Sequence, residues 1–345
     1  MRRALQLARL GEGLTSPNPM VGAVIVHRGL IIGEGYHHRY GGPHAEVNAV
    51  RSVTHPEQLY DSTIYVTLEP CSHYGKTPPC AELIINSGIP RVVVGSTDPN
   101  ERVSGRGIAM LRDAGIEVIT GVLNDKCEEL NRPFMVAHKL HRPYVMLKWA
   151  QSADGFLDCR RDGSHAKPAR FSTPLTSQEM HRLRSHFDAI LVGSGTVMAD
   201  NPRLDVRLIA GRSPRRVVLD RRGLIDPGSQ VFASDSDTLY FSAAQRKCLN
   251  GKAVWHEYTT ADDINNLLHA LWDEGIQSLM VEGGASVLKA FIDSGLWDDA
   301  RIEVSSVSFG PRGTARVDMP DGFISACKYD SNVIINVKNT DISLK

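Results

Sequence analysis

The sequence predicts a protein of two α/β domains. Its 345 residues exceed the usual length of one domain, which is about 100 to 200 residues. Short apolar strand patterns alternate with helical patterns in both halves, as is typical of layered α/β domains. The segment His141-Arg142-Pro143 interrupts this alternation. We therefore expect one domain at residues 1–141 and a second at residues 142–345.

The first half is predicted to begin with a helix and a strand pair. Residues 2–10 place apolar side chains at helical spacing, and the prolines within 15–19 end that helix. VGAVIV and LIIGEGY are predicted to pair as antiparallel strands around a turn at 27–29. The later predicted elements are a helix in AEVNAV, a strand in TIYVTLEP, a helix in AELIINSG, a strand in RVVVGSTDP, a helix, turn and strand in GIAMLRDAGIEVITG, and one helix in DKCEELNRPFMVAHKL.

The second half repeats the alternation of strands and helices. Its predicted elements are strands in PYVMLKWA, DAILVGS, RRVVLD and SLMVEGG, and helices in TSQEMHRLRSHF, DINNLLHALWDEG and ASVLKAFIDSG. A Rossmann dinucleotide fold would place G-x-G-x-x-G after its first strand, and this pattern does not follow PYVMLKWA. The second domain is therefore expected to be an α/β domain of another kind.

Charge and composition exclude several partner classes. Lys plus Arg and Asp plus Glu balance at 39 each, so the net charge gives no reason to expect a nucleic-acid or membrane partner. No apolar run is long enough to cross a bilayer. The six cysteines lack the spacing of a disulfide framework, which fits a reducing compartment. We expect a cytoplasmic protein that acts on a small molecule, as a homo-oligomer.

Residues 44–80 carry the pattern of a catalytic zinc site. His44, Cys71 and Cys80 supply three nitrogen and sulfur ligands, which leaves a fourth position for water. Glu46 stands beside the first ligand, where a carboxylate that does not bind the metal can carry protons for a water whose pKa zinc lowers to about 7. His44 and Glu46 are predicted on the first turn of a helix, Cys71 at a strand end and Cys80 at a helix start. The pattern indicates hydrolytic chemistry.

His-x-Glu followed by Pro-Cys and a second Cys matches the zinc nucleobase-deaminase signature, in which the Glu is the general acid and base. The generic signature spaces its cysteines C-x-x-C, whereas here the eight residues SHYGKTPP separate Cys71 from Cys80. This longer loop favours one branch of the deaminases.

The chain resembles the bifunctional riboflavin-biosynthesis deaminase/reductase over nearly its whole length. The first half carries this resemblance in TSPNPMVGAVIV, GEGYHHRYGGPHAEVNA, YVTLEPCSHYGKTPPC and STDPNERVSGRGIAML, and the second half, more loosely, in LKWAQSADGFL, DAILVGSGTVMADNPRLDVR and LMVEGGASVL. The resemblance implies a cytidine-deaminase-like three-layer α/β/α domain followed by a dihydrofolate-reductase-like α/β domain. It also implies one zinc per chain, NADPH, and two reactions. They are hydrolytic deamination of 2,5-diamino-6-(5-phosphoribosylamino)pyrimidin-4(3H)-one, then reduction of the ribosyl chain to ribityl.

Two positions in the first half are predicted to bind substrate. Asn18 lies between two prolines, which hold it rigid, and the resemblance supports a contact with a pyrimidine edge; an Asn that satisfies a turn is the alternative. Lys76 in the long loop is a candidate for the sugar phosphate, with a solvated lysine as the alternative. The other candidates for the sugar phosphate are His73, Asp98, Asn100 and Arg102.

The site of the second half is predicted at the turn VEGG-ASV. Backbone N–H groups of residues 283–286 are expected to face a pyrophosphate at a helix N-terminus. By resemblance, the cofactor positions are Ala150, Thr196, Asp200, Gly284, Ala285 and Ser286, and the substrate positions are Arg184, Leu204, Arg207 and Glu282. The two arginines suit a sugar phosphate through bidentate pairing.

One segment departs from the family pattern. Many members carry Ser-x-Trp beside the cofactor, where this chain has KPARFSTP, with Pro168 and Arg170 at those positions. The basic side chains nearby are Arg160, Arg161, Lys167 and Arg170. We expect these four side chains to be solvated surface charges; binding of the cofactor 2′-phosphate is the alternative.

Two other classes of protein fit part of the pattern. A deaminase of a nucleic-acid base, with a non-catalytic C-terminal domain, shares the zinc signature, but the neutral charge and the absence of an aromatic-basic stretch weigh against it. A non-enzymatic zinc module needs a fourth protein ligand, for which His73 is the nearby candidate.

Overall fold

The computed structural model describes residues 1–74, 78–100, 104–162, 168–233, 237–244, 253–259 and 261–341. The chain forms two compact units, Met1–Leu140 and His141–Lys345, and each has its own sheet and core. None of the helices in these described ranges has both the length and the apolarity to cross a membrane.

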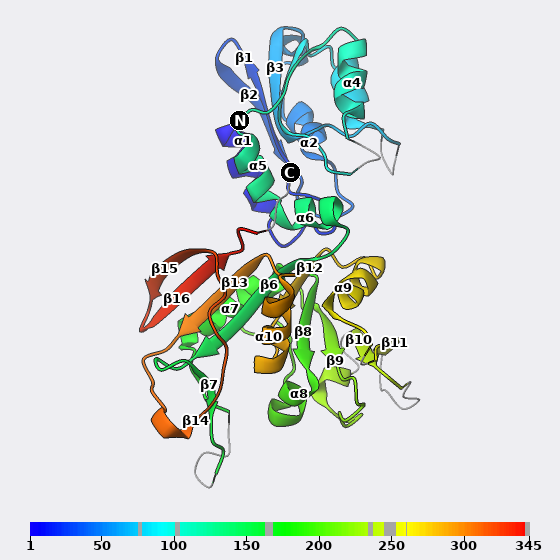
Figure 1. Ribbon diagram of the computed structural model, residues 1–345. Helices are drawn as coiled ribbons and strands as arrows, with labels where there is room; N and C mark the ends of the chain where they lie inside the picture. The colour runs from blue at the N-terminus through cyan, green and yellow to red at the C-terminus, as the bar shows by residue number, and fades with distance from the viewer. Residues whose placement is uncertain are drawn as a thin grey trace. The chain divides into compact units, whose positions relative to one another are not determined.

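The first unit is built on a five-stranded sheet in the order β2-β1-β3-β4-β5 (Figure 1). β1 pairs antiparallel with β2 and β3, while β3, β4 and β5 are parallel. The carboxyl ends of β3 and β4 therefore lie at one edge of the sheet, where the chain leaves toward Cys71 and Asp98. The strands are β1 (Gly22–His27), β2 (Leu30–Tyr36), β3 (Ser62–Leu68), β4 (Arg91–Ser96) and β5 (Glu117–Ile119).

Helices cover both faces of this sheet. Ala23 and Ile25 of β1 join one core with helices α2, α3 and α4, whereas Val24 between them packs against α1. This alternation follows from the period of two in a strand. The helices are α1 (Arg2–Ala8), α2 (Ala45–Arg51), α3 (Cys80–Asn86), α4 (Arg106–Asp113), α5 (Asn124–Leu130) and α6 (Arg132–Leu140). The predicted three-layer α/β/α domain is confirmed (Figure 1).

The single helix predicted in DKCEELNRPFMVAHKL is wrong, because the structure has two helices that meet at Asn131. Pro133 lies in the first turn of α6, where its missing N–H costs nothing, whereas inside a continuous helix its ring would clash with the preceding turn. The amide of Asn131 donates to the carbonyl of Met20 and accepts from the Met20 N–H, both at 2.8 Å. This pair of hydrogen bonds fixes the break.

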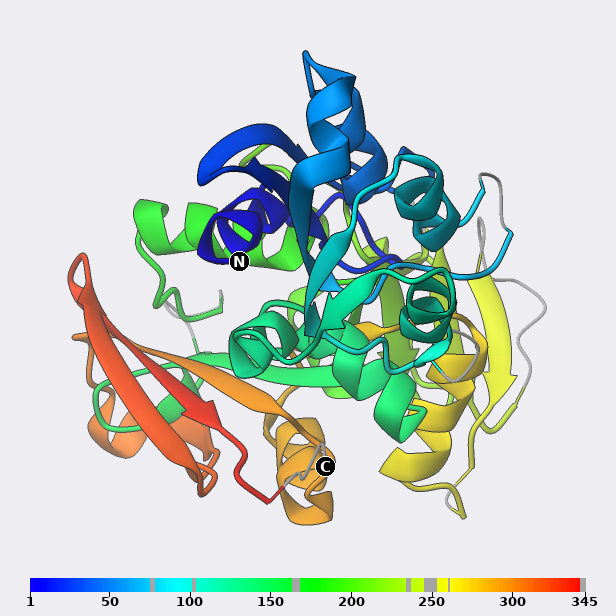
Figure 2. The same cartoon turned by 90° about the horizontal axis from the view of Figure 1, so that it is seen from above.

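The second unit is built on a nine-stranded sheet in the order β11-β10-β9-β8-β12-β6-β13-β16-β15. The strands from β11 to β13 in that order are parallel, and β16 runs antiparallel to its neighbours β13 and β15. β15 and β16 form a ribbon at one edge (Figures 1 and 2). The strands are β6 (Tyr144–Gln151), β8 (Ala189–Gly193), β9 (Arg215–Leu219), β10 (Thr238–Ser242), β11 (Ala253–Glu257), β12 (Ser278–Val281), β13 (Asp299–Val304), β15 (Phe323–Tyr329) and β16 (Asn332–Lys338), with β7 (Phe156–Cys159) and β14 (Gly313–Arg316) in a separate ribbon.

Two helices of this unit begin directly where neighbouring strands end. α8 (Ser194–Asp200) follows β8, and α10 (Ala285–Ser294) follows β12 after Glu282 and two glycines. Both N-termini therefore lie at the carboxyl edge of the parallel strands, the usual place for ligands in such sheets. The other helices are α7 (Pro174–Ser185), which starts with a capping box at Thr173, and α9 (Ile264–Asp273), which starts with one at Asp263.

Candidate active sites

The predicted zinc ligands come together in the first unit. The ligand atoms of His44, Cys71 and Cys80 all lie within 4.8 Å of one another. His44 Nδ1 lies 3.6 Å from the Cys71 sulfur and 3.3 Å from the Cys80 sulfur. A tetrahedral zinc with bonds of about 2.0 Å to nitrogen and 2.3 Å to sulfur separates such ligands by roughly 3.5 Å. The donor set and its spacing fit zinc with one position left open.

The surrounding elements hold these ligands in place. His44 is the N-cap residue of α2, and the side chain of Asn48, one turn along the helix, donates to the carbonyl of Tyr36 at 2.8 Å. At Gly35 on β2, an added Cβ would lie 2.3 Å from the Ala49 nitrogen, so only glycine lets α2 approach the sheet this closely. The metal-ligand helix is thus fixed against β2.

The two cysteines are joined through the backbone. Cys80 is the first residue of α3, and its N–H donates to the Cys71 sulfur at 3.3 Å. Hydrogen bonds from Cys80 and His44 lower the pKa of Cys71, whereas the hydrogen bond with Cys71 and burial raise the pKa of Cys80. The Cys71 thiolate also raises the pKa of His44. Without a metal, the site therefore favours a thiolate at Cys71 and a neutral thiol at Cys80. A divalent cation would balance the negative charges of two thiolates.

Glu46 lies against this cluster without belonging to it. Its side chain is buried on the first turn of α2, with a relative exposure of 3%. Burial, helped by the negative charge of Cys71, raises the pKa of Glu46 to about 7. A carboxyl group with such a pKa can both accept and donate a proton near neutral pH.

A histidine that the sequence analysis missed lies between Asn18 and the metal ligands. His37 Nδ1 is 3.0 Å from the Pro43 carbonyl, so it carries the proton, and Nε2 accepts from the Asn18 amide at 3.3 Å. Its ring meets that of His44 edge to face at 5.6 Å. Burial lowers the pKa of His37. His37 therefore links the predicted residue Asn18 to the zinc ligand His44. The available sequence signal for His37 was its place in the segment HHRY.

A buried carboxylate shapes the edge of the sheet next to the cysteines. Glu69 accepts hydrogen bonds from the N–H groups of Gly105 at 3.0 Å, Gly107 at 3.0 Å and Ile108 at 3.2 Å. It also accepts from the N–H of Asp98 at 3.3 Å, and Asp98, whose pKa is raised to about 6 chiefly by burial, accepts in turn from Asn100. Glu69 therefore joins the end of β3 to Asp98 and to the start of α4.

The remaining candidates of the first half are Lys76, Arg102 and His73. Lys76 and Arg102 lie outside the described residues. His73 is exposed and is not part of the metal-ligand group found among the described residues. The described cluster thus has three protein ligands, as a catalytic zinc site requires, and not the four of a structural site.

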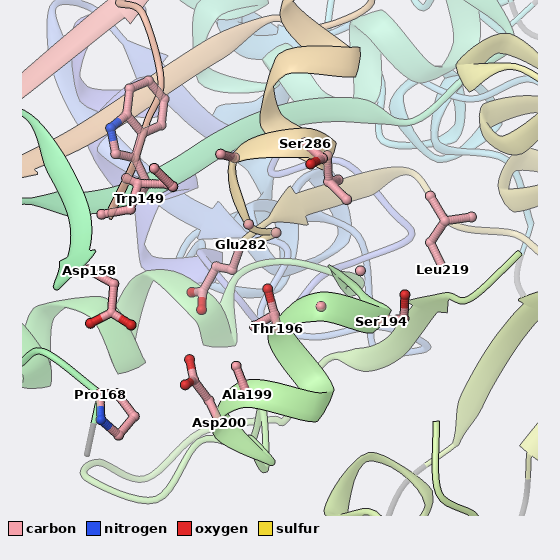
Figure 3. A pocket seen from close by; sticks show the side chains of 18 of the residues that line it. Trp149, Asp158, Pro168, Ser194, Thr196, Ala199, Asp200, Leu219, Glu282 and Ser286 are labelled. Atoms are coloured by element: carbon pink, nitrogen blue, oxygen red, sulfur yellow. The ribbon is translucent and has the colours of Figure 1, made fainter. Parts of the chain in front are cut away.

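The second unit contains a cavity of about 740 Å³ at the carboxyl edge of its parallel strands (Figure 3). The predicted residues on its lining are Ala150, Thr196, Asp200, Glu282, Gly284, Ala285 and Ser286. In Figure 3, Glu282 and Thr196 lie near the middle, Asp158 and Pro168 at one side, and Leu219 at the other. The volume of this cavity suits a cofactor.

The turn before α10 forms a cradle for an anion. Gly284 is the N-cap residue of the ten-residue helix α10, and an added Cβ there would lie 3.3 Å from the Thr196 hydroxyl. At Gly283, an added Cβ would lie 2.7 Å from the Cβ of Val287. The backbone therefore approaches the cavity with no side chain in front of the first N–H groups, which have no partner within the helix. This geometry fits the pyrophosphate of a dinucleotide.

The predicted substrate residues form a second cluster. Arg184 binds both oxygens of Glu282, at 3.1 and 3.0 Å, and donates to the carbonyl of Asp205 at 2.8 Å. Arg207 pairs with the Asp205 carboxylate. Glu282 lines the cavity, whereas Arg184, Leu204 and Arg207 do not appear on its lining. Leu204 is buried in the core, with a positive φ of 57°.

Arg161, one of the basic side chains near the segment that departs from the family pattern, is already paired. Its guanidinium binds Asp158 at 2.5 Å and Asp200 at 2.6 Å. Pro168 lies on the cavity lining, and the N–H of Ala169 donates to Asp158 at 3.1 Å. Pro168, Ala169 and Phe171 of the departing segment thus line the cavity themselves, while Lys167 lies outside the described residues.

The sequence analysis also missed Lys148. This residue lines the cavity from β6, and its positive charge helps to lower the pKa values of Glu282 and Glu303, against the effect of their burial. Glu282 therefore stays ionised between Arg184 and Lys148. A lysine within the apolar pattern PYVMLKWA was the available signal.

Each of the two units contains a match to a protein family. Residues 143–333 match the RibD C-terminal domain, and residues 1–96 match the cytidine and deoxycytidylate deaminase zinc-binding region. The riboflavin biosynthesis protein RibD of Bacillus amyloliquefaciens is 41% identical over 94% of this chain and 88% of its own length. The riboflavin biosynthesis protein RibD of Escherichia coli is 35% identical over 93% of this chain and 90% of its own length.

Solved structures agree with these matches. A diaminohydroxyphosphoribosylaminopyrimidine deaminase/5-amino-6-(5-phosphoribosylamino)uracil reductase from Thermotoga maritima superposes with a TM-score of 0.83 at 36% identity, covering 98% of this chain and 97% of that one. RibD from Acinetobacter baumannii gives a TM-score of 0.87 at 32% identity over the same shares. The chain therefore belongs to the RibD family of riboflavin biosynthesis proteins and is a bifunctional deaminase and reductase, with zinc and NADPH as cofactors.

Proposed function

We propose that the chain catalyses two consecutive steps of riboflavin biosynthesis. The first is the hydrolytic deamination of 2,5-diamino-6-(5-phosphoribosylamino)pyrimidin-4(3H)-one, and the second is the NADPH-dependent reduction of the resulting 5-amino-6-(5-phosphoribosylamino)uracil to its ribityl form. We assign deamination to residues 1–141 and reduction to residues 142–345. The name of the Thermotoga maritima relative, which is similar over nearly the whole chain, supports both reactions.

The observation that carries the proposal is the buried carboxylate of Glu46 beside three metal-ligand atoms. A structural metal site does not require a carboxyl group that is not a metal ligand and whose pKa is raised to about 7 by burial. A hydrolytic site needs one, because a proton leaves the attacking water and protons must reach the departing amine.

The deaminase residues would act as follows. His44, Cys71 and Cys80 would hold the zinc, which when bound supplies a water with a pKa lowered to about 7. Glu46 would take a proton from the attacking water and pass it to the ring nitrogen, while the new C–O bond forms at C2. It would then take the remaining proton from the new hydroxyl group on C2 and deliver it to the amine, so that the C–N bond breaks, ammonia leaves and C2 becomes a carbonyl carbon.

Asn18 and His37 would orient the pyrimidine. Their hydrogen bond at 3.3 Å fixes the Asn18 amide, whose oxygen remains able to accept from a ring N–H or an amino group. Lys76 would bind the sugar phosphate, although it lies outside the described residues.

The reductase residues would place the cofactor along the cavity. Gly284, Ala285 and Ser286 would bind the pyrophosphate at the start of α10, with Thr196 facing them. Ala150 and Asp200 would border the nicotinamide, which when bound supplies a hydride to C1 of the opened sugar. When the ribose ring opens, C1 becomes doubly bonded to the amino nitrogen, so a hydride at C1 must be matched by a proton at that nitrogen. Lys148, on the cavity lining, would give this proton.

Glu282 would form the substrate side of this cavity, supported by Arg184 and Arg207 outside the lining. The bidentate contact with Arg184 holds the Glu282 carboxylate in one orientation, where it can accept from sugar hydroxyls. Arg207, whose side chain is more than half exposed, would bind the sugar phosphate, and Leu204 would set the path of the backbone before it. The zero net charge favours such a small substrate over a nucleic acid, and the cysteine pattern favours the cytoplasm.

Zinc removal separates the two activities. We expect a chelator to stop ammonia release from the diaminopyrimidine phosphate, and we expect the same sample to oxidise NADPH when it is given the pre-deaminated substrate. Zinc added back should restore ammonia release, whereas magnesium at the same concentration serves as the control. Full ammonia release from protein shown to be free of metal would refute the proposal.

A further inference from the structure

The loop at residues 201–207, directly after α8, carries Arg207 and has an unusual backbone. Asn201 and Leu204 have positive φ angles of 42° and 57°. Asparagine tolerates this region, but a leucine adopts it only where surrounding contacts enforce it. Arg207 is the residue to which we assign the sugar phosphate, so the contacts that hold this loop also place the phosphate-binding side chain.

Contacts from three other parts of the second unit hold the loop. Gln230 binds Asn201 twice: its backbone N–H donates to the Asn201 side-chain oxygen at 2.7 Å, and its side-chain amide donates to the Asn201 carbonyl at 2.8 Å. The Ser213 hydroxyl accepts from the N–H of Val206 at 3.0 Å. The third part is α7, which supplies two buried side chains.

These two side chains, His181 and Arg184, lie one turn apart on the same face of α7. Arg184 donates to the carbonyl of Asp205 at 2.8 Å, and the N–H of Arg207 donates to His181 Nδ1 at 3.1 Å. A ring nitrogen that accepts carries no proton, so the proton of the neutral His181 ring lies on Nε2. Because His181 is only 5% exposed, water does not easily replace it as the acceptor. This hydrogen bond fixes the backbone from which the Arg207 side chain projects.

The charged groups around His181 come from α7, from the loop and from the chain after β12. They are Arg184 on α7, Asp205 and Arg207 in the loop, and Glu282. Burial, followed by the positive charges of Arg184 and Arg207, lowers the pKa of His181. His181 therefore remains a neutral acceptor at every pH above the ordinary histidine value of about 6.5.

We propose that His181 is a positioning residue of the reductase site, which accepts the backbone N–H of Arg207 and thereby places the Arg207 guanidinium for the sugar phosphate of the substrate. The inference rests on the proposed function, which assigns the phosphate to Arg207. A neutral acceptor holds the loop without adding a like charge beside Arg184 and Arg207. His181 acts through Arg207 and is not itself on the cavity lining.

The test measures KM and kcat of NADPH oxidation for the full chain, with the pre-deaminated substrate and with the same compound lacking its phosphate. We expect wild type to have the lower KM for the phosphorylated compound. His181→Leu removes the acceptor and should raise that KM by about 3- to 10-fold, the loss typical of one neutral hydrogen bond, while kcat and the KM of the phosphate-free compound stay unchanged. His181→Asn places an amide oxygen close to the position of Nδ1 and should restore the low KM. His269→Leu, at an exposed histidine of α9, is the matched control.

The pH dependence distinguishes an acceptor from a side chain that only fills space. Protonation turns Nδ1 into a donor, so the wild-type KM for the phosphorylated compound should rise as the pH falls from 6.5 to 5. His181→Asn does not titrate, so its KM should show only the smaller change that comes from the substrate phosphate, which is common to both proteins. If acidification instead lowers the wild-type KM relative to that of His181→Asn, His181 binds the phosphate as a cation, and the positioning role is overturned.

The outcomes separate this inference from the proposed function. Wild type that reduces neither compound would overturn the reductase assignment and this inference with it. Wild type that prefers the phosphorylated compound, with a preference that His181→Leu leaves unchanged and a pH dependence that His181→Asn shares, would overturn only the role of His181. An equal rise of both KM values in His181→Leu would also overturn it, because only the phosphorylated compound uses Arg207.

Discussion

Replacement of Glu46 by glutamine is the sharpest single perturbation of the deaminase site. Glutamine keeps the length of the side chain and a hydrogen-bonding end, so it can still lie against the Cys80 thiol. It cannot accept the proton that the attacking water loses. We therefore expect the fold and the zinc content to persist while deamination is lost.

The size of the loss follows from burial. General acid and base catalysis is worth typically 10²- to 10⁴-fold. Since Glu46 is only 3% exposed, bulk water cannot replace the missing carboxylate from that side. We therefore expect the upper part of this range, about 10³- to 10⁴-fold in kcat, or about 4 to 5.5 kcal/mol in activation free energy.

The assay is ammonia release under saturating substrate, with zinc content and circular dichroism measured on the same sample. The exposed Glu57→Gln in the same unit is the matched control and should keep full activity. A loss of less than tenfold in Glu46→Gln, with one zinc bound and the fold intact, would refute the assignment of Glu46 as the proton carrier.

Three further predictions follow from other parts of the structure. Cys80→Ser should bind less than a tenth of the zinc of wild type, whereas the exposed Cys327→Ser should bind a full equivalent, as metal analysis of the purified proteins will show. Lys148→Met should slow NADPH oxidation about 10²-fold or more without changing ammonia release, and an unchanged rate would exclude Lys148 as the proton donor. Burial, followed by Arg184 and Arg207, lowers the pKa of His181, so the unfolded state binds more protons and stability should fall as the pH drops below about 6.5. Urea midpoints at pH 5 and 8 should differ less in His181→Gln than in wild type; an equal difference in the two proteins would contradict this.

The fold class followed from the sequence because hydrophobic periodicity and turn residues agree with it over most of the chain. The strand pair around residues 27–29, the alternation of strands and helices, and the helix starts at Ala45 and Cys80 were all visible as local patterns. The break at Asn131 was missed, although Pro133 is a local signal for a helix end. The hydrogen bonds that fix the break join Asn131 to Met20, more than a hundred residues away. Local patterns cannot contain such contacts.

The strands after residue 295 were also missed. β15 is exposed along nearly all of its length, and β16 alternates only partly, so neither has the buried run or the clear period of two that predicts a strand. β13, β15 and β16 are strands because they pair with one another and with β6 in the sheet, and β14 is one because it pairs with β7. Their register is a property of the tertiary structure.

The zinc ligands could be found from spacing, whereas the groups that assist them could not. His44, Cys71 and Cys80 belong to a compact motif, and the structure brings their ligand atoms together. His37 and Lys148 belong to no recognisable motif. Only the folded structure shows that His37, after β2, lies beside Asn18 and the metal ligands, and that Lys148, on β6, lines the cavity. The reductase positions and the domain boundary at residue 141 stay predictions.

The most direct test of two activities in one chain is a single time course. The purified protein is incubated with the diaminopyrimidine phosphate, with and without NADPH, while ammonia and the absorbance of NADPH are followed separately. The two-site account predicts ammonia release in both samples, and NADPH oxidation that begins after a lag and reaches the same molar amount as the ammonia. NADPH oxidation without prior ammonia release, or ammonia release that requires NADPH, would contradict it.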